Sequence, residues 1–290
     1  MSPRRGGRQQ VATNPNHQDE DGRSRLWLAA WTGLLSTVMR ELRGGAAVDL
    51  LDYLGWSPLF AACEKGHLEV VRSLLAAGAA VDLLEKGGRT PLIAACLRGY
   101  LDVVRCLLRA GAAVGLRDKE GSTPLLAACF GGLLNVVSTL LSAGARADHQ
   151  DKGGLSPLHV ACQVGHVETA GALLSAGARA DLQNADGHTP LHVLCGKGHL
   201  EFARAYLLLS AGTGIDMQST LGHTALHVAC DRGHFEVAHA LLRAGARADL
   251  QDNGHVFLLW YPIIIVLLLL LLSNHVMNRC QGKSPNSTPL

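Results

Sequence analysis

Histidine and cysteine recur together in the second half of the chain, at a spacing that could serve metal binding. Three histidines each stand three residues before a cysteine, in the pairs His159 and Cys162, His192 and Cys195, and His227 and Cys230. Residues three apart share one face of a helix, and zinc accepts both imidazole and thiolate ligands. Cysteine also occupies this position without a histidine, at Cys63, Cys96 and Cys129. A repeated structural unit therefore explains the pairs better than a metal site, and we expect no metal and no other cofactor.

Catalytic and nucleic-acid-binding chemistry find no further support. The sequence lacks a Gly-x-Ser-x-Gly nucleophile turn, a phosphate-binding loop, a Gly-x-Gly-x-x-Gly motif and a His-Glu-x-x-His pair. The net charge of +2 over 290 residues is too balanced for a dedicated nucleic-acid binder. We therefore expect neither an enzyme nor a protein that binds nucleic acid or a small-molecule substrate.

The elements that carry these residues follow a fixed period. Short Ser/Thr-x-Leu triplets begin at residues 24, 57, 90, 123, 156 and 189, each 33 residues after the last, and a seventh begins 35 residues later at 224. Two series of glycines keep the same period, one of them nine residues after each triplet begins. In the sixth repeat the second glycine comes two residues late, which predicts an insertion near residues 207–209. A fixed period of this length is typical of stacked repeats.

Each repeat has the local signals of two short helices. Ser or Thr followed by Pro is a helix N-cap with Pro at the first helical position, as at Ser156 and Pro157. Gly165 can end that helix in the left-handed conformation, and a second helix is expected from Val167. One such pair cannot bury its apolar face alone, so neighbouring pairs must stack.

The repeated runs Gly187-His188-Thr189-Pro190-Leu191-His192 and Gly222-His223-Thr224-Ala225-Leu226-His227 resemble the ankyrin repeat. The resemblance covers residues 20–251 as seven repeats, which start near residues 20, 53, 86, 119, 152, 185 and 220. It implies an all-α solenoid of stacked helix pairs with short β-hairpin connections, whose concave side binds other proteins. The first repeat lacks the motif Pro and His, as a terminal capping repeat can. The second to fourth repeats have Phe60, Ile93 and Leu126 in place of the motif His.

The cysteines fit the same reading. Six share one position of the repeat, and only Cys106 and Cys280 do not. Equivalent positions of stacked repeats are too far apart for a disulfide. We expect reduced, structural thiols in an array that faces the cytosol or nucleus.

The positions that vary between repeats are the candidates for partner binding. By the resemblance, these are residues just before each inner glycine, together with residues of the hairpins. The candidates are Trp56, Lys65, Arg89, Arg98, Phe130, Gln163, His188, Lys197, Asp231 and Arg232. Four repeats place Lys or Arg directly before the glycine, which favours an acidic and partly apolar partner segment. A solvated helix face with no partner explains the same charges equally well.

The two ends of the chain differ from the array. Residues 1–19 have no apolar run, which predicts a disordered leader and no signal peptide. Residues 252–255 are expected to be a linker, and residues 273–290 a polar tail. Between them, Val256–Leu272 is a run of 17 uncharged residues with six consecutive leucines. A helix of this length spans about 25 Å, a little less than a bilayer core of ~30 Å.

Three interpretations of Val256–Leu272 stay open. A single membrane helix would tether a cytoplasmic array to an intracellular membrane, because an exposed run of this kind aggregates in water. A tail that replaces the true final repeats, through splicing or a shifted gene model, would leave a soluble adaptor that recruits substrates. A buried capping helix is the third. The sequence therefore predicts a non-catalytic interaction scaffold, with a lipid bilayer as a second partner if the membrane interpretation holds.

Overall fold

A computed structural model of the chain describes residues 14–210 and 213–254, which form fourteen α-helices. The chain divides into two compact units, Met1–Lys119 and Glu120–Leu290. The division falls at the predicted start of the fourth repeat. Both units are built from the same pair of short antiparallel helices.

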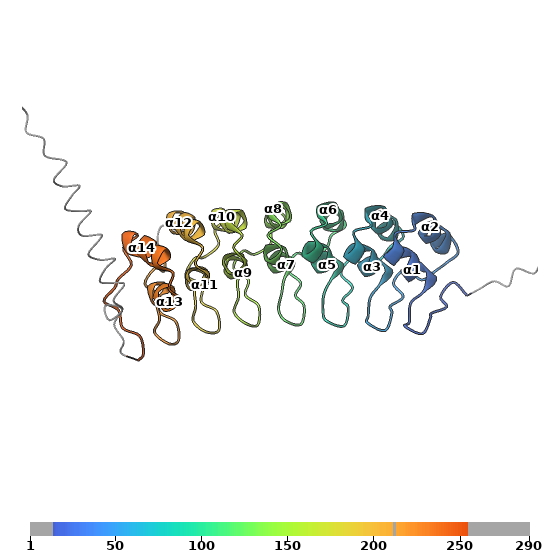
Figure 1. Ribbon diagram of the computed structural model, residues 1–290. Helices are drawn as coiled ribbons and strands as arrows, with labels where there is room; N and C mark the ends of the chain where they lie inside the picture. The colour runs from blue at the N-terminus through green and yellow to red at the C-terminus, as the bar shows by residue number, and fades with distance from the viewer. Residues whose placement is uncertain (1–13, 211–212, 255–290) are drawn as a thin grey trace, which may run out of the picture. The chain divides into compact units, whose positions relative to one another are not determined.

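In the first unit, three helix pairs stack. They are α1 (Arg25–Thr32) with α2 (Leu35–Arg43), α3 (Pro58–Lys65) with α4 (Leu68–Ala76), and α5 (Pro91–Arg98) with α6 (Leu101–Arg109). The first helices pack on one another in order, as do the second helices. The two kinds of helix form two rows, and the connecting loops project beyond the row of first helices (Figure 1).

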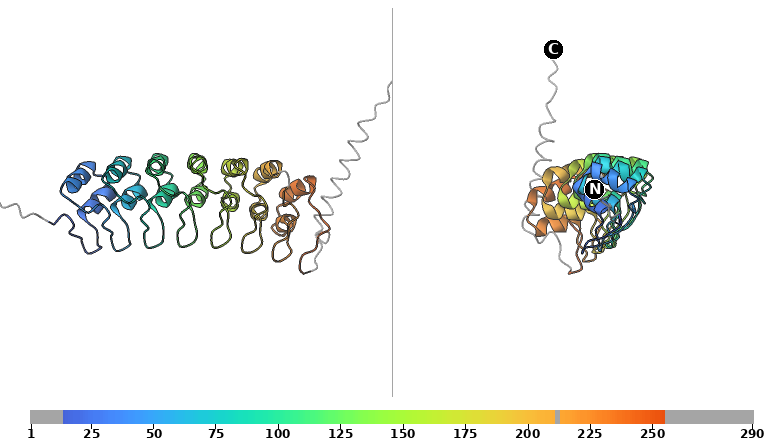
Figure 2. Two further views of the ribbon diagram at one scale, coloured as in Figure 1. Left: turned by 180° about the vertical axis from the view of Figure 1, so that it is seen from behind. Right: turned by 90° about the vertical axis from the view of Figure 1, so that its right-hand side faces the viewer.

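In the second unit, four pairs stack in the same way. They are α7 (Pro124–Phe130) with α8 (Leu134–Ser142), α9 (Pro157–Val164) with α10 (Val167–Ser175), α11 (Pro190–Lys197) with α12 (Leu200–Leu209), and α13 (Ala225–Asp231) with α14 (Phe235–Arg243). The same two rows and the projecting loops are visible in this unit from behind (Figure 2). The predicted all-α ankyrin-type solenoid is confirmed.

Local sequence signals account for where each first helix begins and ends. The Ser57 hydroxyl accepts a hydrogen bond from the Phe60 N–H at 3.1 Å, and Pro58 occupies the first helical position of α3. Gly66 then ends α3 with a φ of +76°. A β-carbon there would also meet the ring of Tyr100 at 2.8 Å. This position therefore requires glycine for both its backbone conformation and its close contact with the next repeat.

The core of each unit consists of small and aliphatic side chains. Ala62 and Cys63 are fully buried in α3, where their small size lets neighbouring first helices approach closely. Val71 and Leu74 of α4 are also fully buried. The repeated cysteine position is buried in every repeat that has it, at Cys63, Cys96, Cys129, Cys162, Cys195 and Cys230. All six are free thiols. Burial raises the pKa of each, that of Cys129 to about 12, so they pack as small apolar residues.

The connections expected as short β-hairpins are turns in this structure. Asp52 closes one of them, because its side chain accepts hydrogen bonds from the N–H groups of Leu54 and Trp56 at 2.9 and 2.8 Å. The Lys86 N–H then donates to the Leu54 carbonyl at 3.1 Å and so joins consecutive loops. The described residues contain no strand, and their one isolated β-bridge joins Gln18 and Ser24. In a loop of this kind, a side chain at the start accepts hydrogen bonds from backbone N–H groups two and four residues later. The loop is therefore too short for paired β-strands.

The described array extends past both predicted ends. Gln18 donates a side-chain hydrogen bond to the Leu51 carbonyl at 2.8 Å, so the predicted leader of residues 1–19 is too long. At the other end, the Asn253 N–H donates to the Leu221 carbonyl at 3.0 Å. Residues 252–254 therefore continue the series of stacked loops, although the linker was predicted to begin at residue 252, and residue 255 lies outside the described part of the chain. Residues 1–13 lie outside the described part of the chain.

The first repeat has the composition of a terminal cap. Thr37 and Glu41 stand where the second repeat has the buried Val70 and Leu74. Among the described residues no helix pair lies before α1 and α2, and polar residues at these positions are typical of a capping repeat, although Glu41 itself is buried.

The predicted insertion in the sixth repeat changes its second helix. α12 has ten residues, whereas each of the other second helices has nine. Tyr206 of α12 is buried, and its hydroxyl donates to the Ala180 carbonyl at 3.3 Å.

The predicted membrane helix at 256–272 and the polar tail at 273–290 lie outside the described residues. Within residues 14–210 and 213–254, every helix is too short or too polar to cross a bilayer.

Candidate functional site

Within each unit, three positions of every repeat lie on one surface, which we call the inner face of that unit. They are the residue before the N-cap of the first helix and the two residues before the glycine that ends it. These positions contact one another: the rings of Trp31 and Trp56, from adjacent repeats, lie 5.7 Å apart, and His223 Nδ1 lies 4.0 Å from Asp231 of its own repeat. All ten candidate residues predicted from the sequence occupy these positions.

The inner face of the first unit is aromatic. The ring centroids of Trp27 and Trp31 are 5.5 Å apart, and those of Trp56 and Phe60 are 4.8 Å apart. Trp27 and Phe60 are buried, while Trp31 and Trp56 are partly exposed. Sequence reasoning chose only Trp56, although the 33-residue period already placed the aromatic residues on adjacent repeats. Partly exposed tryptophan offers a large contact area at a small entropic cost.

The predicted cations of this unit are largely engaged within it. Arg98 Nε donates to Glu64 at 2.8 Å, and the Glu64 carboxylate keeps the pKa of Arg98 above its usual value. Arg89 Nε lies 3.1 Å from Glu85. Lys65 Nζ lies over the Trp31 ring, 3.9 Å from its centroid. The expected basic stripe is therefore much weaker here, because two of its three cations have an acidic partner.

Two buried polar atoms in the same area have no hydrogen-bond partner within the described part of the chain. They are Glu64 Oε2 and Trp27 Nε1. Glu64 is only 7% exposed. An unsatisfied buried carboxylate oxygen is costly, so a donor brought from outside would be bound favourably.

The inner face of the second unit contains a groove of about 450 Å³ between the first helices and the loops. It is lined by Gly153, Leu155, Gln163, Asn184, Ala185, Asp186, Val193 and Lys197. Two of the predicted residues, Gln163 and Lys197, thus line one groove. Lys197 is exposed and has no acidic partner among the described residues. Leu155 and Val193 supply an apolar part that sequence reasoning missed.

Phe130 at the end of α7 is 66% exposed, and Val164 at the end of α9 is 42% exposed. Large apolar side chains with this exposure are favourable contacts for a partner. His188 is partly exposed and stacks on His192, with centroids 5.5 Å apart and planes 22° apart. The last predicted pair, Asp231 and Arg232, is exposed. The second unit therefore combines apolar groups with a lysine that has no ion pair among residues 120–210 and 213–254, and Asp186 lines the same groove.

The buried histidines that suggested a metal site have structural roles. The Nδ1 atom of His192 accepts from the Thr189 N–H at 3.2 Å, and its Nε2 atom lies 2.8 Å from the His223 carbonyl. His159 bonds Ser156 and His188 in the same way. Burial lowers the pKa of His159 and lowers that of His192 to about 4. The described residues contain no group of three or more side chains that could hold a metal ion.

Comparison with known proteins agrees with this geometry. The family model described as ankyrin repeats (3 copies) matches residues 10–83, 26–118, 106–184 and 158–252. The four matches overlap and together span most of the chain. A search of the curated proteins finds no significant match.

Proposed function

Because the chain belongs to the ankyrin-repeat family, whose members are generally non-catalytic binding scaffolds, we propose that it is a protein-interaction scaffold that binds through its inner face. The observation that carries the proposal is a contrast between positions of the repeat. The packing positions hold the same small residues in most repeats, whereas the inner-face positions differ from one repeat to the next. Such variation on a constant framework suits a specific partner. We propose no catalytic role for it.

The second unit supports a partner segment that is acidic and partly apolar. A carboxylate of the partner would meet Lys197 in the groove, and an adjacent apolar side chain would contact Leu155 and Val193. The exposed Phe130 would extend the apolar contact. This pairing would place one charged contact beside several apolar ones, as in protein interfaces with a few dominant residues.

In the first unit, the proposed contact is aromatic rather than electrostatic. Trp31 and Trp56 supply the area, and Glu64 Oε2 would accept a hydrogen bond from the partner. Arg98 would serve mainly to hold Glu64 in place.

Capture with inner-face variants tests this proposal. Lys197→Glu reverses the charge in the groove, and Trp56→Ala removes aromatic area. Arg72→Glu on α4 is the control, because it reverses an exposed charge outside the inner face. We expect wild type and the control to capture the same proteins, identified by mass spectrometry, and the inner-face variants to lose a defined subset. Loss of the same subset with Arg72→Glu would contradict an inner-face site.

We propose further that Val256–Leu272 tethers a cytoplasmic array to an intracellular membrane. The support is in the sequence: 17 uncharged residues, with Trp260 and Tyr261 near one end and Arg279 beyond the other. The alternative is a soluble adaptor that recruits substrates and whose terminus arises from splicing or a shifted gene model. The abrupt end of the repeat pattern after Gly254 favours that alternative.

Extraction of membranes at alkaline pH distinguishes the two. A spanning helix keeps the chain in the membrane pellet, whereas a soluble adaptor is released. Asn286-Ser287-Thr288 is a glycosylation sequon beyond the apolar run. A glycosidase-sensitive shift that is lost in Asn286→Gln would place the tail in the lumen.

A further inference from the structure

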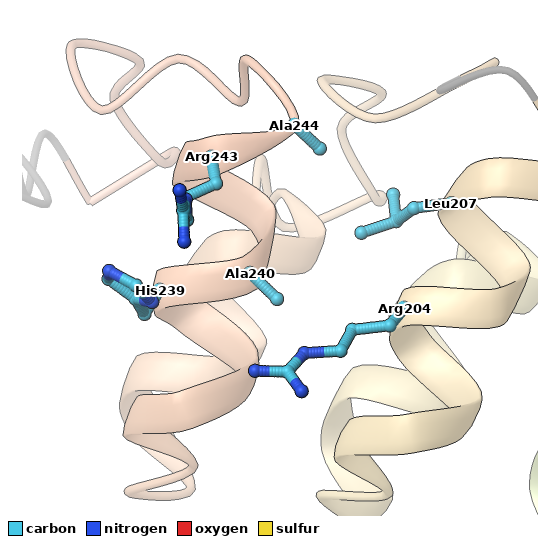
Figure 3. A pocket seen from close by; sticks show the side chains of 6 residues that line it. All are labelled: Arg204, Leu207, His239, Ala240, Arg243 and Ala244. Carbon is cyan, nitrogen blue, oxygen red and sulfur yellow. The ribbon is translucent and has the colours of Figure 1, made fainter. Parts of the chain in front are cut away.

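Polar side chains that converge distinguish the groove beside Lys197 from another cavity of the second unit. That cavity, of about 490 Å³, lies between α12 and α14. Arg204 extends from α12 towards α14, whereas His239 and Arg243 extend from α14 away from α12 (Figure 3). Its polar groups therefore do not meet around one ligand group. The groove, by contrast, brings together side chains from the fifth and sixth repeats.

The seventh repeat shows what lies at the equivalent place there. The imidazole of His223, the residue before the N-cap of α13, lies between two carboxylates. Its Nε2 atom is 3.4 Å from Asp252 of the following loop, and its Nδ1 atom is 4.0 Å from Asp231 near the end of α13. A polar side chain of the protein itself thus fills the space between the loop and the end of the helix.

In the groove, the same three positions hold Leu155, Asn184 and Gln163. Leucine forms no side-chain hydrogen bond, so Leu155 is an apolar floor between two amides. Asn184 Oδ1 accepts from the N–H groups of Asp186 and His188 at 3.0 and 2.9 Å, which fixes the side chain and leaves its Nδ2 atom as a donor. Among residues 120–210 and 213–254, neither this Nδ2 atom nor the Gln163 amide has a hydrogen-bond partner.

We propose that Gln163 and Asn184 bind the main chain of an extended partner segment that lies across Leu155. Asn184 Nδ2 would donate to a main-chain carbonyl, and Gln163 Oε1 would accept from a main-chain N–H. An extended segment has these groups free, whereas a helix uses them internally. The proposal rests on the binding through the inner face proposed above, and it adds the conformation of the bound partner.

The charges of the groove favour a particular composition of that segment. Lys197 is the last residue of α11, and Asp186 lies three residues before the N-cap of that helix. An acidic side chain at Lys197 and a basic one at Asp186 would complement both charges. The helix has eight residues and is about 12 Å long. The two charged residues of the segment would therefore be roughly three or four extended residues apart.

Peptides selected on the full chain, in an uncharged detergent, from a phage library of short linear sequences are the probe. The test variant is Asn184→Asp. Aspartate is compatible with this position, because Asp151 of the preceding loop accepts the equivalent hydrogen bonds from the N–H groups of Gly153 and Leu155. The variant therefore keeps the loop closed but replaces the donor with an acceptor. The matched control is Ser219→Asp, which adds the same charge at the equivalent position of the next loop, outside the groove lining.

We expect the selected peptides to bind wild type and Ser219→Asp equally in fluorescence anisotropy, and Asn184→Asp roughly tenfold more weakly or worse. An ester in place of one main-chain amide of the peptide should weaken binding to wild type by about fivefold at one position. The ester lacks the N–H that Gln163 accepts, so this loss should disappear in Gln163→Leu. Gln163 is exposed, so that variant is expected to fold, and circular dichroism checks all three variants.

Recovery of no peptide, or equal binding by Asn184→Asp, would overturn the site. An ester effect of the same size in Gln163→Leu, or no ester effect at any position, would overturn recognition of the main chain. Selected peptides that are helical when bound, as measured by nuclear magnetic resonance, would overturn the extended conformation.

Failure of main-chain recognition gives a different result from failure of the inner-face proposal. If Lys197→Glu loses partners in the capture experiment but the ester has no effect, the inner face binds through side chains alone. If the selected peptides depend on Asn184 and Gln163 but no inner-face variant loses a partner, the groove binds extended segments and the inner-face scaffold proposal is wrong.

Discussion

Acid should weaken the second unit specifically through its buried histidines, and His192→Leu should remove much of that effect. The Nε2 atom of His192 faces the His223 carbonyl, so it carries the proton, and Nδ1 accepts from the Thr189 N–H. A second proton would have to bind Nδ1, and this would break the hydrogen bond from the Thr189 N–H at the N-terminus of α11. Leu126 occupies the same position in α7, so leucine is compatible with this fold.

The magnitude follows from the pKa of His192, which burial lowers from 6.5 to about 4. The folded state therefore binds fewer protons than the unfolded state between these two values. The contribution of His192 to the free energy of unfolding is therefore fully present above pH 6.5 and falls as the pH drops through this window. At pH 4.5 the loss from this residue amounts to about 2.5 kcal/mol.

Hydrogen–deuterium exchange of α11 peptides at pH 7.5 and 4.5, corrected for intrinsic rates, measures this loss. At pH 7.5 the variant should be less stable by roughly 1 kcal/mol, because it lacks the bond to the His223 carbonyl. At pH 4.5 it should equal or exceed wild type. Peptides of α3 and α5 are internal references, since Phe60 and Ile93 replace the histidine there. If wild type and variant lose the same protection in α11, the reasoning is refuted.

Three other predictions concern packing and thiol chemistry. Gly66→Ala should destabilise the first unit clearly more than Gly78→Ala in urea unfolding, because both have positive φ but only the first would clash with a neighbouring ring. Arg98→Ala should lower the stability of that unit by about 1 kcal/mol, since it leaves the buried Glu64 unpaired, and adding Glu64→Leu should restore part of the loss; no recovery in the double variant would contradict this. Under native conditions, a thiol reagent followed by peptide mapping should label the partly exposed Cys106 well before the six buried cysteines, and equal labelling would contradict the burial argument.

Most of the fold could be predicted from the sequence because its signals are local and repeated. Ser57 and Pro58 mark where α3 begins, and Gly66 marks where it ends, without knowledge of any distant residue. The late second glycine of the sixth repeat likewise located the longer α12. The ends of the array were less accurate, because the side-chain hydrogen bond of Gln18 to the Leu51 carbonyl is not encoded by any local pattern.

The candidate site was predicted less completely, because its charges depend on contacts between repeats. The sequence predicts Arg98 to be a free surface cation, but in the structure it pairs with Glu64 of the preceding repeat. The groove beside Lys197 also needed Leu155 and Val193, which two different repeats supply. Which variable positions point the same way could be inferred, but which of them neutralise one another could not.

Site-specific photo-crosslinking tests the central claim, that the inner face binds a protein partner, most directly. A photoreactive amino acid at Phe130 lies on the inner face, and one at Ser138 of α8 is an exposed control among the second helices. In cells, the account predicts a defined adduct from position 130 that is lost when Lys197→Glu is added, and no such adduct from position 138. The same adduct from both positions, or from position 138 alone, would contradict it.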